Sequence, residues 1–443
     1  MAEPVTRFEY LSGFWQSVAG RGRALVGMRR PPPLDGEGAI ELARKLLGGR
    51  GEASGAATAQ TLLAGFSALS ETEKRAFLTR IGDEFGPDLV ALQAAARAFL
   101  DAPDSVRAGQ LAARAEPTRQ ELIRRLNHAP GGTFALVKMR ETLLAALREG
   151  LPMEALDQDF RHLFGSWFNR GFLVLRRIEW TTPANILEKI IRYEAVHEIS
   201  TWEELRRRLD PPDRRLYAFF HPALNDEPLI FVEVALTAAI PEGIEPLLAS
   251  ERAPLAPEAA RTAVFYSISN AQAGLSGVSF GNFLIKQVVE DLRRELPRLQ
   301  TFVTLSPVPG FARWLAQEKE TSRFVSPEAR RTLEAIEAGD TPEGAERTLS
   351  ALAAAYFLHA RTAAGRVIDP VARFHLGNGA RLERINPRGD RSPGGLKQSH
   401  GVMVNYLYDL DHIEANHEAF ANRGTVAASS AVRKLAAPFV AKG

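Results

Sequence analysis

The sequence predicts an α+β protein, in which an all-helical N-terminal bundle precedes a domain with a mixed, mostly antiparallel sheet. Residues 37–164 show helical spacing of apolar residues throughout, with no run typical of a strand. Beyond them, short β-branched and aromatic runs alternate with helical segments. Two such runs, 216–220 and 229–236, are close enough in sequence to pair as antiparallel strands. We therefore expect an N-terminal arm (1–36), a helical oligomerisation domain (37–164) and a sheet domain (165–443).

The helical region carries start and stop signals of helices but no pattern of catalytic residue types. Ser70 with Glu73, and Thr118 with Glu121, have the spacing of a capping box, in which side chains satisfy free N–H groups at a helix N-terminus. A proline and two glycines end one helix just before Thr133, which can cap the next. We expect this region to serve packing or oligomerisation.

The composition excludes several classes of protein. With 55 basic and 53 acidic residues the formal net charge is +2, whereas general nucleic-acid binders concentrate basic charge on one face. No apolar run reaches the ~18 residues that suggest a membrane span. The absence of cysteine rules out disulfides, thiolate nucleophiles and zinc–thiolate or iron–sulfur sites. Because the N-terminus also lacks the apolar stretch of a secretory signal, we expect a cytoplasmic protein without nucleic-acid or membrane partners.

The most informative stretch is 263–314, in which a strand, a loop, a helix and a second strand follow one another. Residues 264–268 and 302–305 are short β-branched and aromatic runs that suit buried strands, and 283–296 has apolar residues at helical spacing. Such a unit presents free backbone N–H groups at a helix N-terminus, a geometry that attracts phosphate. The loop contains Gly274, Gly277 and Gly281.

This loop has two chemical interpretations besides an ordinary glycine-rich turn. It can cradle the phosphates of a nucleotide or coenzyme A. It can also be a nucleophile elbow, because residues 277–281, centred on Ser279, fit G-x-S-x-G. An elbow serine follows its strand at once, whereas Asn270 to Ser276 intervene here, a length that suits wrapping a pyrophosphate. A Walker motif is excluded, since no Gly-Lys-Ser/Thr is present.

Other polar residues in the sheet domain are candidates for function. Ser306 ends the second strand of the stretch, next to a proline that stiffens its backbone. His375 lies at the edge of an expected strand and beside a glycine turn. His412 and His417 suggest a metal site, but their five-residue spacing does not put both rings on one helix face. The basic run 206–208 is typical of a solvated helix face.

The rest of the sheet domain is expected to alternate helices and strands. The pattern predicts helices over 184–195, 327–362 and 427–436, and late strands over 374–385 and 402–408 with the loop 386–401 between them.

Several motifs in order resemble the malonyl-CoA decarboxylase family, strongly over 160–410 and more loosely over the helical half. They are Trp167-Phe168-x-x-Gly171-Phe172-Leu173, Phe265-Tyr266-Ser267-Ile268-Ser269, Gly274-Leu275-x-Gly277-Val278-x-x-Gly281-x-Phe283-Leu284-Ile285-Lys286, Leu305-Ser306-Pro307-x-Pro309-Gly310-Phe311, Phe374-His375-Leu376-x-Asn378-Gly379-Ala380 and Asn405-Tyr406-x-Tyr408.

The resemblance implies a helical N-terminal domain and a catalytic domain with the N-acetyltransferase-like (GNAT) fold. It implies Ser306 and His375 as the catalytic pair, with Tyr408 beside them. The family carries glutamate at the position of Ser279, and a serine cannot replace that acid or base. The substrate-binding residues that it implies are Ser267, Ser276, Gly277, Val278, Ser279, Phe280, Gly281 and Asn282.

The implied reaction is the decarboxylation of malonyl-CoA to acetyl-CoA and CO2 through a thioester enolate. We expect His375 to protonate C2 of the enolate, Ser306 to bond the carboxylate or the thioester oxygen, and Tyr408 to orient His375 or the substrate. No metal, biotin, thiamine or pyridoxal cofactor is needed, because the thioester is the electron sink and coenzyme A belongs to the substrate.

The expected partners are malonyl-CoA, acetyl-CoA and further copies of the chain. The resemblance implies a homo-oligomer, a dimer or tetramer built through the helical domain. The family's inter-subunit disulfides cannot form without cysteine. Alternative functions are a coenzyme A-dependent acetyltransferase with an amine acceptor and a non-enzymatic helical scaffold. A serine hydrolase using Ser279 is the weaker third.

Overall fold

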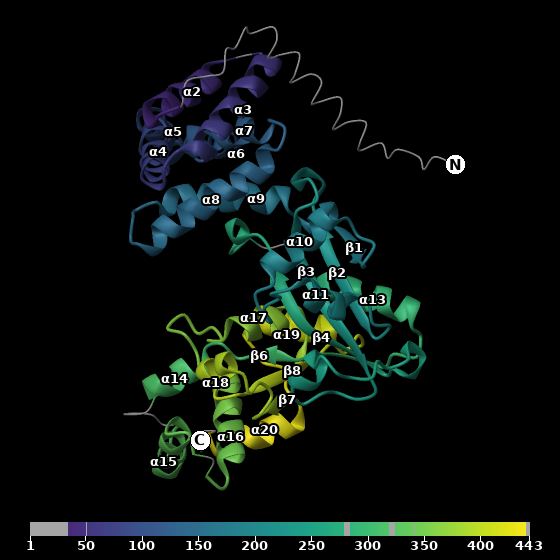
Figure 1. Ribbon diagram of the computed structural model, residues 1–443. Helices are drawn as coiled ribbons and strands as arrows, with labels where there is room; N and C mark the ends of the chain where they lie inside the picture. The colour runs from purple at the N-terminus through teal and green to yellow at the C-terminus, as the bar shows by residue number, and fades with distance from the viewer. Residues whose placement is uncertain (1–33, 50, 279–283, 319–323, 341, 440–443) are drawn as a thin grey trace, which may run out of the picture. The chain divides into compact units, whose positions relative to one another are not determined.

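The computed structural model describes residues 34–49, 51–278, 284–318, 324–340 and 342–439. The chain divides into two compact units, each described here by itself (Figure 1). The helical unit takes the chain up to Leu173 together with two later segments, His221–Glu227 and Gln272–Phe280. The sheet unit takes the remainder.

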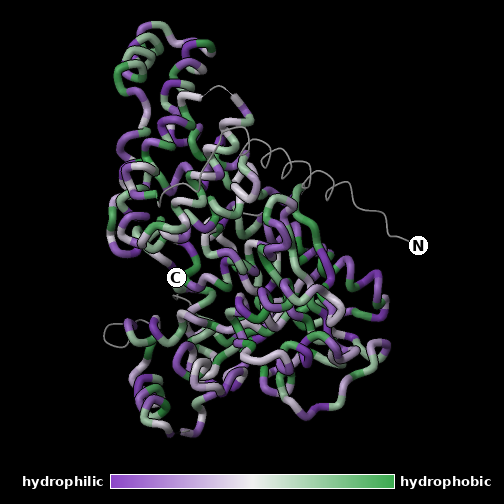
Figure 2. Tube along the Cα trace, turned by 45° about the horizontal axis from the view of Figure 1, so that its top comes forward, coloured by the Kyte–Doolittle hydropathy of each residue, from purple (hydrophilic) through white to green (hydrophobic). Residues whose placement is uncertain are grey.

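The helical unit contains helices from α2 to α9, as its sequence pattern predicts. Their apolar residues alternate with polar ones along each helix, and Figure 2 shows this alternation of hydropathy. The core holds fully buried residues such as Leu62, Leu78, Leu136 and Phe164. The helices are α2 (Gly36–Gly48), α3 (Glu52–Ala68), α4 (Glu71–Glu84), α5 (Leu89–Asp101), α6 (Ser105–Ala115), α7 (Thr118–Asn127), α8 (Gly132–Arg148) and α9 (Glu154–Trp167).

One of the expected helix caps forms and two do not. Ser70 and Glu73 make both bonds of the capping box at the start of α4. The expectation for Thr118 is wrong, because Pro117 takes the N-cap position of α7. The expectation for Thr133 is also wrong: α8 begins at Gly132, after a residue in the left-handed region, and the Thr133 hydroxyl donates to the side chain of Asn127 instead.

The sheet unit is built on one mixed sheet in the order β1-β2-β3-β4-β5-β8-β6, with β7 paired to β8. Every pair is antiparallel except β4 with β5. The predicted α+β class is therefore confirmed. The strands are β1 (Val174–Ile178), β2 (Arg214–Phe220), β3 (Pro228–Thr237), β4 (Thr262–Asn270), β5 (Thr301–Thr304), β6 (Ser306–Pro307), β7 (Arg381–Asn386) and β8 (Met403–Leu407).

The parallel pair separates along its length. β4 pairs with β5 only as far as Phe265 opposite Thr304, and one further backbone bond joins Leu305 N–H to the Phe265 carbonyl. Along its opposite edge, β4 stays paired with β3 as far as Asn270. Helix α13 (Leu284–Glu295) connects the two parallel strands. A parallel pair that diverges after a helical crossover is the N-acetyltransferase-like arrangement that the family resemblance implies.

Helices pack against this sheet: α11 contacts β2, and α10 contacts β3. Helix α16 packs on α20, and both contact β7, side by side in Figure 1. The helices of the sheet unit, besides α13, are α10 (Ala184–Tyr193), α11 (Trp202–Leu209), α12 (Glu245–Leu248), α14 (Phe311–Glu318), α15 (Pro327–Glu337), α16 (Ala345–Leu358), α17 (Pro370–Gly377), α18 (Pro393–Ser399), α19 (Ile413–Arg423) and α20 (Ser430–Ala436).

Two late segments differ from their expected structure. The strand expected over 374–385 begins only at Arg381, because Asp369 caps a helix that starts with Pro370 and carries the chain to Gly377. The loop expected over 386–401 contains α18, which starts in the same way, with Ser392 as the cap and Pro393 as the first helical residue.

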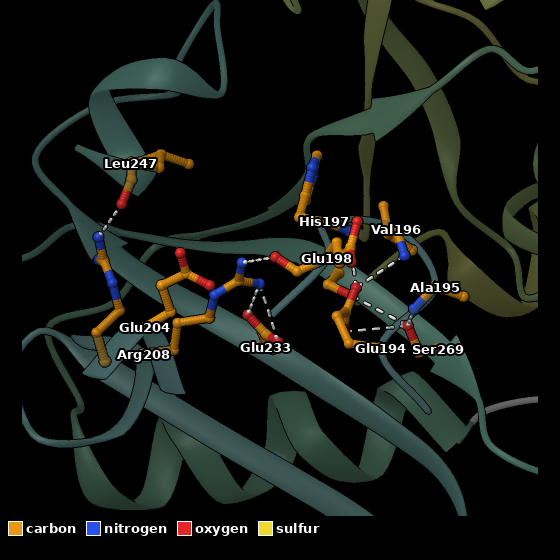
Figure 3. A network of polar contacts seen from close by, with 12 residues as sticks. Glu194, Ala195, Val196, His197, Glu198, Glu204, Arg208, Glu233, Leu247 and Ser269 are labelled. Atoms are coloured by element: carbon orange, nitrogen blue, oxygen red, sulfur yellow. Dashed lines mark hydrogen bonds and ion pairs between the residues drawn. The ribbon is translucent and has the colours of Figure 1, made fainter. Parts of the chain in front are cut away.

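A buried polar network lies where α10 and α11 meet β3 and β4 (Figure 3). Arg208 of α11 pairs with Glu233 of β3 at 3.0 Å, and Glu233 is fully buried. The expectation that all of 206–208 is solvated is therefore wrong for Arg208. Burial raises the pKa of Glu233 to about 7, against the opposing effect of the arginine. Removing either partner would leave the other as a buried ionisable group without its ion pair, which lowers the stability of the fold.

Candidate active site

Three of the predicted residues meet in the sheet unit. The Ser306 hydroxyl lies 3.2 Å from Nε2 of His375, and Nδ1 of His375 lies 2.8 Å from the hydroxyl of Tyr408. All three side chains are at most 5% exposed. They come from β6, from α17 and from the residue after β8. The sequence separates the outermost two by about a hundred residues, and the sheet order brings their strands together.

The hydrogen bonds fix the tautomer of His375. Ser306 donates its one hydroxyl hydrogen to Oγ1 of Thr304 at 2.9 Å, so Ser306 can only accept from His375. Nε2 of the ring is therefore the donor. In a neutral imidazole Nδ1 is then the acceptor, and it receives the hydroxyl hydrogen of Tyr408. A directed chain results, running from Tyr408 through His375 and Ser306 to Thr304.

Residues of β5 and β8 hold this hydrogen-bonded chain in place. Oγ1 of Thr304 also accepts the backbone N–H of Tyr406, and Asn405 donates to the Thr304 carbonyl at 2.8 Å. The ring of Tyr406 stacks on His375, with 4.6 Å between centroids and 24° between planes. Sequence reasoning missed these supporting roles. Strand alternation could have indicated two of them, because Thr304 and Tyr406 each lie two residues before a predicted site residue.

Helix α17 sets the position of His375. Its N-cap Asp369 is almost fully buried and accepts the Ala372 N–H at 2.8 Å. The hydroxyl of Tyr356, on α16, donates to the other Asp369 oxygen at 3.3 Å. A Cβ at Gly310 would approach that hydroxyl to 2.5 Å, so only glycine lets the chain after β6 pass this close. His375 therefore lies on a braced helix.

Burial keeps His375 neutral. The ring is only 2% exposed and has no carboxylate among its hydrogen-bond partners, so the buried site offers a protonated ring neither water nor a negative charge. This lowers the pKa of His375 to about 3. The same burial raises the pKa of Tyr408 well above its usual value. At neutral pH the pair therefore consists of a neutral imidazole and a neutral phenol, consistent with the directed chain.

This protonation state can be measured. We expect the NMR signals of the His375 ring to show the Nε2–H tautomer and no titration between pH 8 and 5. The folded-state pKa is depressed, so protonation begins only well below the ordinary value of about 6.5. A midpoint near 6.5 would contradict the assignment.

The predicted phosphate loop belongs, in its described part, to the helical unit. Residues 273–275 form a short 3-10 turn against α8. The N–H groups of Leu275, Ser276 and Val278 donate to carbonyls within the loop itself. A cavity of about 580 Å³ lies beside it, bounded by Gly277, Val278 and residues of α8 and α9. The described part is thus the base of the loop, and Ser279, Phe280, Gly281 and Asn282 lie outside the described residues.

Ser267 lies elsewhere, in the buried network. Its hydroxyl donates to the carboxylate of Glu194 at 2.8 Å, and Ser269 donates to the same group at 3.1 Å. Glu194 also accepts the N–H groups of Val196 and His197 (Figure 3). With its only hydrogen engaged, Ser267 supports the chain after α10, and no bond joins it to His375.

The histidines and the apolar helices of the described part of the chain have other surroundings than a metal site or a membrane span would give them. No cluster of three or more histidine, aspartate or glutamate side chains there could hold a metal. His412 instead contacts Asp409, and His417 contacts the Gly377 carbonyl. Among the described helices, none combines the length and apolar character that crossing a bilayer requires.

Comparisons with known proteins identify the family. The family model for the malonyl-CoA decarboxylase N-terminal domain matches residues 85–168, and the one for the C-terminal domain matches residues 171–442. A mitochondrial malonyl-CoA decarboxylase from Anser anser anser is 36% identical over 354 residues, covering 73% of this chain and 70% of the relative. The mitochondrial enzyme from Mus musculus is 34% identical and covers 84% of each chain.

Solved structures agree with the sequence comparisons. The crystal structure of malonyl-CoA decarboxylase from Rhodopseudomonas palustris matches with a TM-score of 0.87 and 60% identity, covering 91% of this chain and all of that one. The structure from Agrobacterium vitis matches with a TM-score of 0.85 and 56% identity, covering 90% of this chain and 99% of that one. The chain belongs to the malonyl-CoA decarboxylase family.

Proposed function

We propose that this chain decarboxylates malonyl-CoA to acetyl-CoA and CO2, with His375 as the proton donor and Ser306 and Tyr408 as its partners. The observation that carries the residue assignment is the directed chain from Tyr408 through His375 to Ser306. In this chain the Nε2–H group of His375 donates to the Ser306 hydroxyl inside a buried site. Family membership supports the substrate and the reaction.

The proposed steps follow from that geometry. Cleavage of the bond between C2 and the carboxylate releases CO2 and leaves its electron pair on the thioester as an enolate. When the substrate binds, Ser306 turns its hydroxyl hydrogen from Thr304 to the carboxylate or the thioester oxygen, where negative charge is held. The enolate carbon then takes the Nε2 proton of His375. The hydrogen bond that Tyr408 donates to Nδ1 stabilises the resulting imidazolate, and a proton from solvent restores Nε2–H after the product leaves.

A neutral histidine is suited to this step. The carbon of a thioester enolate is a stronger base than the imidazolate that a neutral imidazole leaves behind, so an imidazolium is not required. Burial also excludes bulk water from the proton donor, which strengthens the electrostatic interactions of the site. The reaction as proposed needs no cofactor, since the thioester itself accepts the electrons.

The substrate contacts proposed at 276–282 complete this assignment. Gly277 and Val278 line the cavity at the described base of the loop, and Ser276 precedes them in the chain. The remaining contacts, from Ser279 to Asn282, stay predictions. We infer that the loop holds the coenzyme part of malonyl-CoA.

The reaction is tested directly with purified protein. Incubation with malonyl-CoA and EDTA is expected to yield acetyl-CoA and CO2 in equal amounts, since no step uses a metal. Loss of activity in EDTA, restored by a divalent cation, would contradict the proposal. Transfer of an acetyl group to an added amine, without CO2, would instead favour an acetyltransferase.

Self-association through the helical unit is the proposed oligomeric arrangement. Helices α5 and α6 have no buried residue, and both display large apolar side chains. Leu89, Val90, Leu100 and Val106 are each at least 67% exposed. Such a surface suits a partner copy, and light scattering of the purified chain measures whether a dimer or a tetramer forms. The cytoplasmic location stays a prediction, because relatives named as mitochondrial exist.

A further inference from the structure

The hydroxyl of Tyr406 is a buried polar group that has no hydrogen-bond partner among the described residues. Tyr406 lies on β8, none of its surface is exposed, and its ring stacks on that of His375. Buried hydroxyls nearly always have a partner, because an unmade hydrogen bond costs the desolvation of the group. An unpaired hydroxyl beside the proposed proton donor is consistent with a partner that arrives with the substrate.

Tyr406 lies on the same face of the sheet as the proposed catalytic residues. Met403 and Leu305 pack together in an apolar cluster on one face. Because side chains alternate along a strand, Tyr406 and Ser306 belong to the opposite face. The ring of His375 joins them there, since it contacts the Ser306 hydroxyl at 3.2 Å and stacks on Tyr406. Tyr406 is therefore part of the site on two counts, its face and its neighbour.

The hydroxyl hydrogens of this cluster differ in whether they are already used. In the free protein Ser306 donates to Thr304, and Tyr408 donates to His375. Of the three hydroxyls on Ser306, Tyr406 and Tyr408, only that of Tyr406 has no acceptor among the described residues. It can bond a substrate oxygen without first breaking another hydrogen bond, which is the property of a preorganised donor.

The surroundings of Tyr406 keep it in place and keep it neutral. Its backbone N–H donates to Oγ1 of Thr304 at 3.0 Å, and the preceding Asn405 donates to the Thr304 carbonyl at 2.8 Å. Burial, reinforced by the negative charge of Asp369, raises the pKa of Tyr406 well above its usual value. The phenol therefore retains its hydrogen at neutral pH and acts as a donor rather than as a base.

We propose that Tyr406 is a further catalytic residue, whose hydroxyl donates a hydrogen bond to the thioester oxygen of malonyl-CoA. The inference rests on the proposed function, in which the thioester becomes an enolate. Loss of CO2 moves negative charge from the carboxylate to the thioester oxygen. A donor on that oxygen bonds more strongly in the transition state than in the bound substrate, and this difference accelerates the step. A donor on the carboxylate would instead hold the charge where it starts.

Tyr406→Phe tests this role, because it removes the hydroxyl and keeps the stacked ring. We expect kcat to fall about 10²-fold with KM little changed, the lower end of the loss for one oxyanion donor, since Ser306 remains. The melting temperature should not fall, because the variant loses a buried hydroxyl that had no partner. The NMR signals of His375 should still show the Nε2–H tautomer, since the bond from Tyr408 is untouched.

Tyr217→Phe is the matched control. Tyr217 lies on β2 and is 1% exposed, and its hydroxyl likewise has no hydrogen-bond partner among the described residues. It is not one of the residues that bond or stack on His375. Tyr217→Phe should therefore match Tyr406→Phe in its melting temperature, while its kcat and KM for malonyl-CoA stay at the native values.

Three results would overturn the inference alone. They are a native kcat in Tyr406→Phe, a rise in KM without a fall in kcat, and a change of the His375 tautomer, which would mean that Tyr406 acts only through the histidine ring. A native chain that releases no CO2 from malonyl-CoA would overturn the proposed function, and this inference with it. The two failures are thus distinguished by the activity of the native chain.

Discussion

Replacing His375 with alanine is expected to lower kcat for malonyl-CoA decarboxylation by about 10²–10⁴-fold, the range typical of a lost general acid. The enolate would then have to wait for a proton from water, which the buried site excludes. KM should change little, because the ring is proposed to act on the reacting carbon rather than on the coenzyme. Initial rates of CO2 release and of acetyl-CoA formation measure both constants.

Tyr408→Phe is the informative companion to this variant. It keeps an aromatic ring beside His375 and removes only the donor to Nδ1. We expect a smaller fall in kcat than for His375→Ala, together with loss of the fixed tautomer in the NMR spectrum. Near-native turnover by His375→Ala, in a variant whose melting temperature shows that it is folded, would rule out His375 as the proton donor.

Ser306→Ala is expected to reduce kcat/KM by about 10²–10³-fold, as removal of one oxyanion donor typically does. Ser306 accepts from Nε2 of His375, and its hydroxyl hydrogen, which bonds Thr304 in the free protein, is proposed to turn to the substrate oxygen. The loss should fall mainly on kcat, because charge on the thioester oxygen grows towards the transition state.

Two further variants separate this role from its alternatives. Thr304→Val removes the acceptor of the Ser306 hydroxyl and keeps the shape, so it should reduce activity less than Ser306→Ala. Ser279→Ala tests the nucleophile elbow. If Ser279→Ala abolished turnover while Ser306→Ala retained it, a serine hydrolase mechanism would be favoured over the one proposed.

Local sequence patterns predicted the strands of this fold well. The runs at 216–220, 229–236 and 264–268 are all strands, because a continuous apolar, β-branched run has few other ways to be buried. The region around His375 was harder, since Phe374, His375 and Leu376 suit a strand as well as a helix. The deciding signal lay upstream, in the cap Asp369 and the proline after it.

Long-range contacts account for what the sequence could not predict about the site. Motif order could pair Ser306 with His375, but the stacked ring of Tyr406 and the acceptor Thr304 depend on how β5, β6 and β8 meet. Ser267 belongs to a conspicuous motif, yet its hydroxyl serves Glu194, more than seventy residues earlier. No spacing rule reveals such a partner, because only the folded sheet brings the two together.

The contact of the loop base with α8 also limits how this protein can be cut into fragments. The family models place a domain boundary near residue 170. A fragment beginning at Val174 would retain Ser306, His375 and Tyr408. The loop base at 272–278 would lose its contacts with Val137 and Arg140, and the buried Leu275 would face water. Such a fragment should aggregate or bind substrate poorly. Exchanging helical regions between relatives should succeed only when the loop is exchanged with them.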